Sequence, residues 1–140
     1  MNDHVFGPKG LPPYPNSDAA FDFLKRWRPD GPWVLAAIGE SGDAPAVRTF
    51  AAGEASALCR WIDNWQGKKN LYFTVNDVRE AMSRKPAKED MAAARALQVD
   101  IDPRPGHDAQ DERLRAENAL HNFNPPPTLI ADSGGGLQAF

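Results

Sequence analysis

The sequence of 140 residues has one cysteine, three histidines and no long apolar run. A single cysteine, Cys59, permits neither an internal disulfide nor a cysteine-rich zinc site, and the adjoining Leu58 predicts that it is a small buried side chain without chemistry. The histidines lack the H-E-x-x-H spacing of zinc proteases. Because no segment reaches the ~20 apolar residues of a membrane helix, we expect a soluble protein without a membrane partner.

An excess of basic charge is also absent, since the formal net charge is −3. Domains that coat nucleic acid by bulk electrostatics usually have a pI above about 9, so any contact with nucleic acid must be local. The best candidates lie within the basic stretch from Lys68 to Arg95. They are Arg84, Lys85 and Lys88. A solvated surface of mixed charge is the alternative interpretation of this stretch.

The N-terminus has neither the basic nor the apolar region of a secretory signal, which favours a cytoplasmic location. Three prolines between positions 12 and 15 forbid a regular helix, so residues 1–16 are expected to form an extended arm. Residues 17–140 are long enough for one domain with its own core.

Hydrophobic periodicity predicts an α+β fold with an antiparallel or mixed sheet and helices on one face. Helices are expected over 18–28, where Ser17 or Asp18 can cap the first turn, over 54–65, over a short segment 88–94, and over 108–123 with apolar contacts from Leu114, Leu120 and Phe123. Strands are expected over 33–38, 46–51, 70–75, 97–101, 128–131 and from 137 onward. The aromatic stripe of the second helix, with Trp61 and Trp65, indicates core packing.

The first chemical motif is Asp100-Ile101-Asp102 at the end of a predicted buried strand. Alternate strand residues face the same side, roughly 6–7 Å apart, while Ile101 faces the core. Two carboxylates on one face repel unless a cation lies between them, and Mg²⁺ or Mn²⁺ suits such an oxygen-only site. An EF-hand loop is excluded, because Pro105 stands where its turn glycine should be. A plain strand end is the competing interpretation.

The second motif is a glycine turn that precedes a strand. It comprises Ser133, Gly134, Gly135, Gly136, Leu137 and Gln138. Glycines permit positive φ and let backbone N–H groups approach an anion, so the turn can hold phosphate. It is not a P-loop, because no Lys-Ser/Thr pair follows the glycines. A flexible hairpin turn without a ligand is the alternative.

In this order, the two motifs and the helix between them resemble the archaeo-eukaryotic primase superfamily, and most closely the RepB-like primase or primase–polymerase domains of phages and plasmids. The resemblance covers roughly residues 33–140. Four segments carry it, which are 70–76, 84–90, 97–103 and 127–140.

This resemblance implies a nucleotidyltransferase of DNA replication that joins nucleotides on a DNA template, with an RRM-like sheet and divalent metals. Asp100 and Asp102 would be the catalytic metal ligands. The glycine turn from Ser133 to Gly136, together with Gln138, would hold the incoming nucleoside triphosphate. Arg84, Lys85 and Lys88 would face nucleic acid, and a helicase domain or another replication partner is expected.

The sequence departs from the family pattern twice. Gln138 stands where many members have histidine, and it cannot carry positive charge. The family's third motif, an aspartate on a later strand, would follow Phe140. We therefore interpret 17–140 as the N-terminal part of a primase domain that is inactive alone, with an exposed sheet edge near Phe140 that favours a homo-oligomer. The alternatives are a non-catalytic module that binds single-stranded nucleic acid for replication or regulation, and an α+β scaffold without a site.

Overall fold

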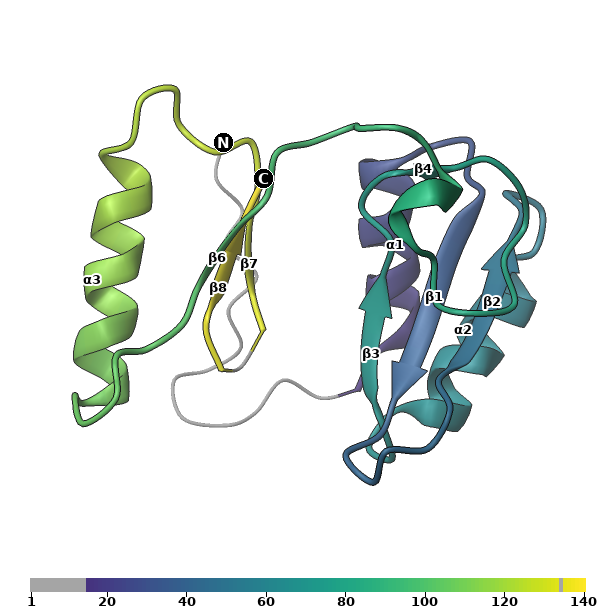
Figure 1. Cartoon of the computed structure of the whole chain (residues 1–140), viewed down its shortest axis with the longest axis horizontal. Helices are drawn as coiled ribbons and strands as arrows, with labels where there is room; N and C mark the ends of the chain where they lie inside the picture. The colour runs from purple at the N-terminus through teal and green to yellow at the C-terminus, as the bar shows by residue number, and fades with distance from the viewer. Residues whose placement is uncertain (1–14, 134) are drawn as a thin grey trace. The chain divides into compact units, whose positions relative to one another are not determined.

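The computed structural model describes residues 15–133 and 135–140, which form helices and antiparallel sheets as the predicted α+β class requires. The expected arm over residues 1–16 lies almost wholly outside the described residues. Two compact units divide the chain, the first ending at Ala93 and the second beginning at Ala94 (Figure 1). A single domain over 17–140 stays a prediction.

The sheet of the first unit has the strand order β2-β1-β3. Its central strand is β1 (Trp33–Ile38), which pairs antiparallel with β2 (Ala46–Phe50) and with β3 (Asn70–Phe73). Because β1 is central, its residues from Trp33 to Ala37 are all buried. The predicted hairpin and the predicted third strand are confirmed.

Two helices, α1 (Ser17–Trp27) and α2 (Ala55–Trp65), cover one face of this sheet (Figure 1). Their apolar stripes meet alternate residues of β1 in one core. The buried members of that core are Leu24, Trp33, Leu35, Phe50, Leu58 and Ile62. Each fully buried leucine or phenylalanine contributes about 1.5–3 kcal/mol relative to an exposed one. The prediction that the α2 stripe is core packing is confirmed, with Trp61 in edge contact with Phe50.

Two details of these helices differ from the expectations. Asn16, and not Ser17 or Asp18, caps α1, because its side chain accepts the Ala19 N–H at 3.0 Å. Cys59 is half-buried and its sulfur lies 3.7 Å from the carbonyl oxygen of Ser17, so the expectation of a buried cysteine is wrong.

The segment after β3 crosses the other face of the sheet. The hydroxyl of Thr49, a residue paired with Val34 of β1, accepts the Met82 N–H at 2.7 Å and donates to the Met82 carbonyl at 3.0 Å. Val34 lies on the face opposite the helices, since strand residues alternate between faces. Met82 is therefore buried against that face.

This segment contains β4 (Asp77–Val78), the 3₁₀ turn η1 (Lys88–Asp90) and β5 (Met91–Ala93). The predicted short helix over 88–94 is wrong beyond its first turn. The Asp90 carbonyl accepts the Arg79 N–H and not an N–H further along a helix, and the chain then pairs antiparallel with β4. Strand pairing thus replaces the helix.

The second unit has a three-stranded antiparallel sheet in the order β6-β8-β7, with α3 (Ala109–His121) on one face (Figure 1). The strands are β6 (Val99–Ile101), β7 (Ile130–Asp132) and β8 (Leu137–Ala139). Their core lies between the sheet and α3. Its members are Ile101, Ala116, Leu120, Ile130, Leu137 and Ala139.

Several apolar residues expected in this core are exposed instead. Leu97 and Val99 are 90% and 53% exposed, so the expected burial of 97–101 is wrong except at Ile101, although Val99–Ile101 do form the strand β6. Leu114 and Phe123 are 57% and 64% exposed, and only Leu120 of the three predicted α3 contacts is buried. One helix covers one face of a short sheet, which leaves the edge of β6 and the outer side of α3 in solvent.

The strand before Phe140 is not at a sheet edge. β8 pairs with β6 on one side and with β7 on the other, and Phe140 exchanges backbone hydrogen bonds with Leu129. The expectation of an exposed edge near Phe140 is therefore wrong, since the outer strands of this sheet are β6 and β7. Among the described helices, none has the length and apolar character needed to cross a membrane.

Candidate functional site

The pairing of β6 with β8 decides which side chains share a face of the second sheet. Asp100 lies directly opposite Gln138, and Gln138 lies opposite Ala131 of β7. Ile101 and Leu137 form the next pair and belong to the core beneath α3. Because neighbours along a strand alternate between faces, Asp100 and Gln138 point away from α3, toward the uncovered face.

Asp102, the residue after β6, lies beside the glycine turn. A Cβ at position 136 would lie 3.1 Å from Oδ1 of Asp102 and 2.6 Å from the carbonyl oxygen of Ile101. The structure therefore brings the D-x-D motif and the glycine turn together, although more than thirty residues separate them in the sequence. Both aspartates are exposed, as a ligand entering from solvent requires.

The two carboxylates suit a divalent cation with few protein ligands. Within the described residues, no hydrogen bond or ion pair engages the side chain of Asp100 or Asp102. The same residues contain no cluster of three or more His, Cys, Asp or Glu side chains that could hold a metal. Mg²⁺ is usually bound through one or two carboxylates, with water and substrate phosphates in its remaining positions, so two aspartates fit it.

The glycine turn is closed by hydrogen bonds between its ends. The Ser133 N–H donates to the Gly136 carbonyl, and the Gly136 N–H donates to Oγ of Ser133, each at 3.0 Å. Neither Gly135 nor Gly136 adopts positive φ, so the expected use of glycine for that purpose is wrong at these two positions. Gly134 lies outside the described residues. At Gly136, glycine is required by the close approach of Ile101 instead.

These bonds limit which groups of the turn can meet a phosphate. The backbone N–H groups of Ser133 and Gly136 already have acceptors within the turn. Gly135 is exposed, and a Cβ there would meet no atom within 4 Å. Of the described turn residues, Gly135 therefore leaves the most open path for a phosphate to reach the turn. Gln138, on the following strand, lies opposite Asp100.

The predicted nucleic-acid residues lie in the first unit and differ in their surroundings. Arg84 forms a two-pronged ion pair with Asp90, at 2.7 and 2.8 Å, which raises the pKa of Arg84 and lowers that of Asp90. Arg84 therefore holds the turn around η1 together. Lys85 and Lys88 are exposed on the same segment and remain the candidates for contact with phosphate.

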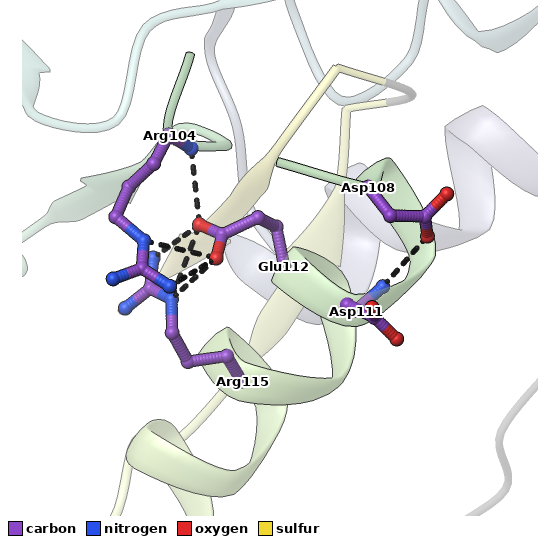
Figure 2. Close-up of polar contacts among 5 residues, drawn as sticks. All are labelled: Arg104, Asp108, Asp111, Glu112 and Arg115. Atoms are coloured by element: carbon purple, nitrogen blue, oxygen red, sulfur yellow. Dashed lines mark hydrogen bonds and ion pairs between the residues drawn. The ribbon is translucent and has the colours of Figure 1, made fainter. Parts of the chain in front are cut away.

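A buried charge in α3 was not among the predicted functional residues. Glu112 is 3% exposed, and both of its carboxylate oxygens accept hydrogen bonds from arginines (Figure 2). Arg104 donates from its backbone N–H at 3.0 Å and from its guanidinium at 2.9 and 2.6 Å. Arg115 donates from its guanidinium to both oxygens, at 2.9–3.2 Å. Glu112 thus joins the loop after β6 to the first turn of α3.

Charge-assisted hydrogen bonds set the ionisation of this cluster. The bonds from Arg104, and then those from Arg115, hold the pKa of Glu112 far below its usual value, while Glu112 raises the pKa of Arg104. The sequence does contain a signal for this site. Glu112 stands four residues before Ala116 and eight before Leu120, on the stripe that faces the core.

Searches of protein-family models, of curated proteins and of solved structures find no match to this chain.

Proposed function

We propose that the second unit carries the metal and nucleotide site of a template-dependent nucleotidyltransferase of the primase–polymerase type, acting in DNA replication. The proposal combines the resemblance of residues 33–140 to the archaeo-eukaryotic primase superfamily with the geometry of the sheet. Mg²⁺ or Mn²⁺, a nucleoside triphosphate and a DNA template are the implied ligands.

The observation that carries the proposal is the adjacency of Asp102 and Gly136. Oδ1 of Asp102 lies only 3.1 Å from where a Cβ on Gly136 would stand, and Asp100 lies opposite Gln138 on the uncovered face. A metal ligand beside a turn that is open to an anion is the arrangement that a metal–triphosphate complex needs.

Each group has a distinct task in this proposal. Asp100 and Asp102 supply negative oxygens for the metal, which, when bound, would stabilise the charge on the attacking and leaving oxygens of nucleotidyl transfer. Gln138 can donate a hydrogen bond to a phosphate oxygen from its amide. Gly135 leaves room for the phosphates, because a side chain there would stand in the approach to the turn.

Titration with Mn²⁺ followed by a nucleoside triphosphate tests the proposal. The double variant Asp100→Asn/Asp102→Asn keeps the shape of both side chains and removes their charge, so it should abolish metal-dependent nucleotide binding. A matched control, Asp22→Asn/Asp63→Asn, removes two exposed carboxylates of the first unit and should bind as the unmodified protein does. Equal binding by both double variants would exclude the proposed site.

A second candidate is a non-catalytic module that binds single-stranded nucleic acid, which the exposure of Lys85 and Lys88 favours. Binding of this kind releases counterions, so its affinity falls steeply with salt and does not depend on metal. The variant Lys85→Ala/Lys88→Ala should then weaken binding and reduce the salt slope by about 2. Binding that requires Mn²⁺ and survives this double substitution would instead support the metal site.

A further inference from the structure

Glu112 occupies a place in the fold where a charge is costly. It lies on the buried stripe of α3 with Ala116 and Leu120, and its side chain is 2% exposed. A well-packed apolar side chain often stabilises such a position as well as an ion pair does, because burying a charge carries a desolvation cost. Packing alone therefore does not explain a carboxylate at this position. Its role lies in the groups that it holds by hydrogen bonds.

Arg104 is held by Glu112 at two separate points. One carboxylate oxygen, Oε2, accepts the backbone N–H of Arg104 at 3.0 Å, and the other, Oε1, accepts its guanidinium at 2.6 and 2.9 Å (Figure 2). The backbone bond matters most, because it fixes the path of the chain and not merely the position of a long side chain.

Only Pro103 separates Arg104 from Asp102. The proline ring fixes its own φ near −65° and restricts the backbone of the residue before it. The constraint on Arg104 therefore passes to Asp102 through a stiff segment. On the other side, Asp102 follows Ile101, which is paired with Leu137 and whose carbonyl oxygen lies against Gly136. Asp102 is thus held between two fixed points.

We infer that Glu112 is a positioning residue for the metal site, which acts through Arg104 to hold the carboxylate of Asp102 toward the cation. The inference rests on the proposed function, because it takes Asp102 to be a metal ligand. Groups that orient metal ligands without touching the metal typically change metal affinity 10–100-fold when substituted.

Arg115 provides the contrast that separates positioning from stability. Arg104 and Arg115 each direct a guanidinium at Glu112, and their side chains are similarly exposed, at 55% and 41%. Only Arg104 is close to Asp102 along the chain, with Pro103 between them. Arg115 lies in α3, about one turn after Glu112. Substituting either residue removes one positive charge and part of the support of Glu112.

The test measures Mn²⁺ affinity for four variants of the full chain, at a temperature where circular dichroism shows each to be folded. Glu112→Gln should weaken Mn²⁺ binding by about 10–100-fold. Arg104→Ala should weaken it less, because the backbone N–H of residue 104 still reaches Glu112. Arg115→Ala should lower the melting temperature and leave Mn²⁺ affinity unchanged. Asp100→Asn/Asp102→Asn should not bind Mn²⁺.

Two failures are distinguishable. If Mn²⁺ binds the unmodified protein and is lost in the double aspartate variant, but Glu112→Gln and Arg104→Ala match Arg115→Ala, the positioning role is wrong and the metal site stands. If the unmodified protein does not bind Mn²⁺, or the double variant binds it equally well, the proposed function fails and the positioning role falls with it. Arg104→Ala keeps the test usable should Glu112→Gln fail to fold.

Discussion

Gly136 and Ile101 approach each other so closely that no side chain fits between them. A Cβ on residue 136 would lie 2.6 Å from the Ile101 carbonyl oxygen, where an ordinary contact needs at least 3.4 Å. The oxygen belongs to the backbone of β6, so it cannot move aside without displacing the strand that carries Asp100. This contact links the glycine turn to the D-x-D motif.

Gly136→Ala should therefore destabilise the second unit by about 1–3 kcal/mol, as overpacking typically does, and weaken Mn²⁺ binding. Gly135→Ala is the matched control, since a Cβ there meets nothing within 4 Å and φ is not positive. Urea denaturation followed by circular dichroism measures the stability of both variants, and titration with Mn²⁺ measures their metal affinity. A stable Gly136→Ala variant would mean that β6 and the turn are not held at this distance.

Two leucines of α3 differ in burial and provide a test of the second core. Leu120 is 6% exposed and Leu114 is 57% exposed. Leu120→Ala should cost about 2–5 kcal/mol because it leaves a cavity between α3 and the sheet. Leu114→Ala should change the free energy of unfolding by less than about 0.5 kcal/mol. Equal losses from the two substitutions would contradict the orientation of α3.

The contact of Thr49 with Met82 holds the segment that carries Lys85 and Lys88 against the first sheet. Thr49→Val removes both hydrogen bonds and leaves the N–H and carbonyl of Met82 without partners, which should cost about 1–3 kcal/mol. Hydrogen exchange of residues 76–93 should then accelerate. Thr49→Ser restores the hydroxyl and should restore protection, whereas unaltered exchange in Thr49→Val would show that the segment is held by other contacts.

The stability contributed by Glu112 should depend on pH in a defined direction. Its pKa is lowered from a usual value of 4.5 by the bonds from Arg104 and Arg115, so folding favours the ionised form. The stabilisation is fully present above the unfolded pKa and is lost as pH falls through the folded one. The difference in melting temperature between the unmodified protein and Glu112→Gln should be constant from pH 7 to about 5 and shrink below about 4.5. A difference that grows on acidification would contradict the ion pairs.

Sequence patterns predicted the elements that have a strong local signal. The strand predicted from the apolar run of β1 and the core packing predicted for the aromatic stripe of α2 are confirmed, because both elements contribute side chains to one core. The pattern failed at Leu97 and Val99, which were predicted to be buried but are exposed, Val99 on the outer strand β6 and Leu97 just before it. Burial there depends on which strands are neighbours, and a local pattern carries no such information.

The candidate site was predictable in one respect and not in another. Alternation along the predicted strand led to the expectation that Asp100 and Asp102 share a face, and in the structure Asp102 lies beside Gly136 while Asp100 pairs with Gln138. The role of Glu112 was not predicted, because an acid in the first turn of a helix already suits the helix dipole. Only the fold shows that this acid points inward and meets Arg104.

The most direct test of the metal site is the pattern of NMR line broadening that substoichiometric Mn²⁺ causes in backbone amides. The proposed site predicts broadening centred on 100–102 and 135–138. Asp108 and Asp111, at the start of α3, form the competing acidic group, and their amides should broaden less. Broadening centred on 108–111, or spread evenly over exposed carboxylates, would contradict the proposal that the D-x-D motif and the glycine turn form one metal site.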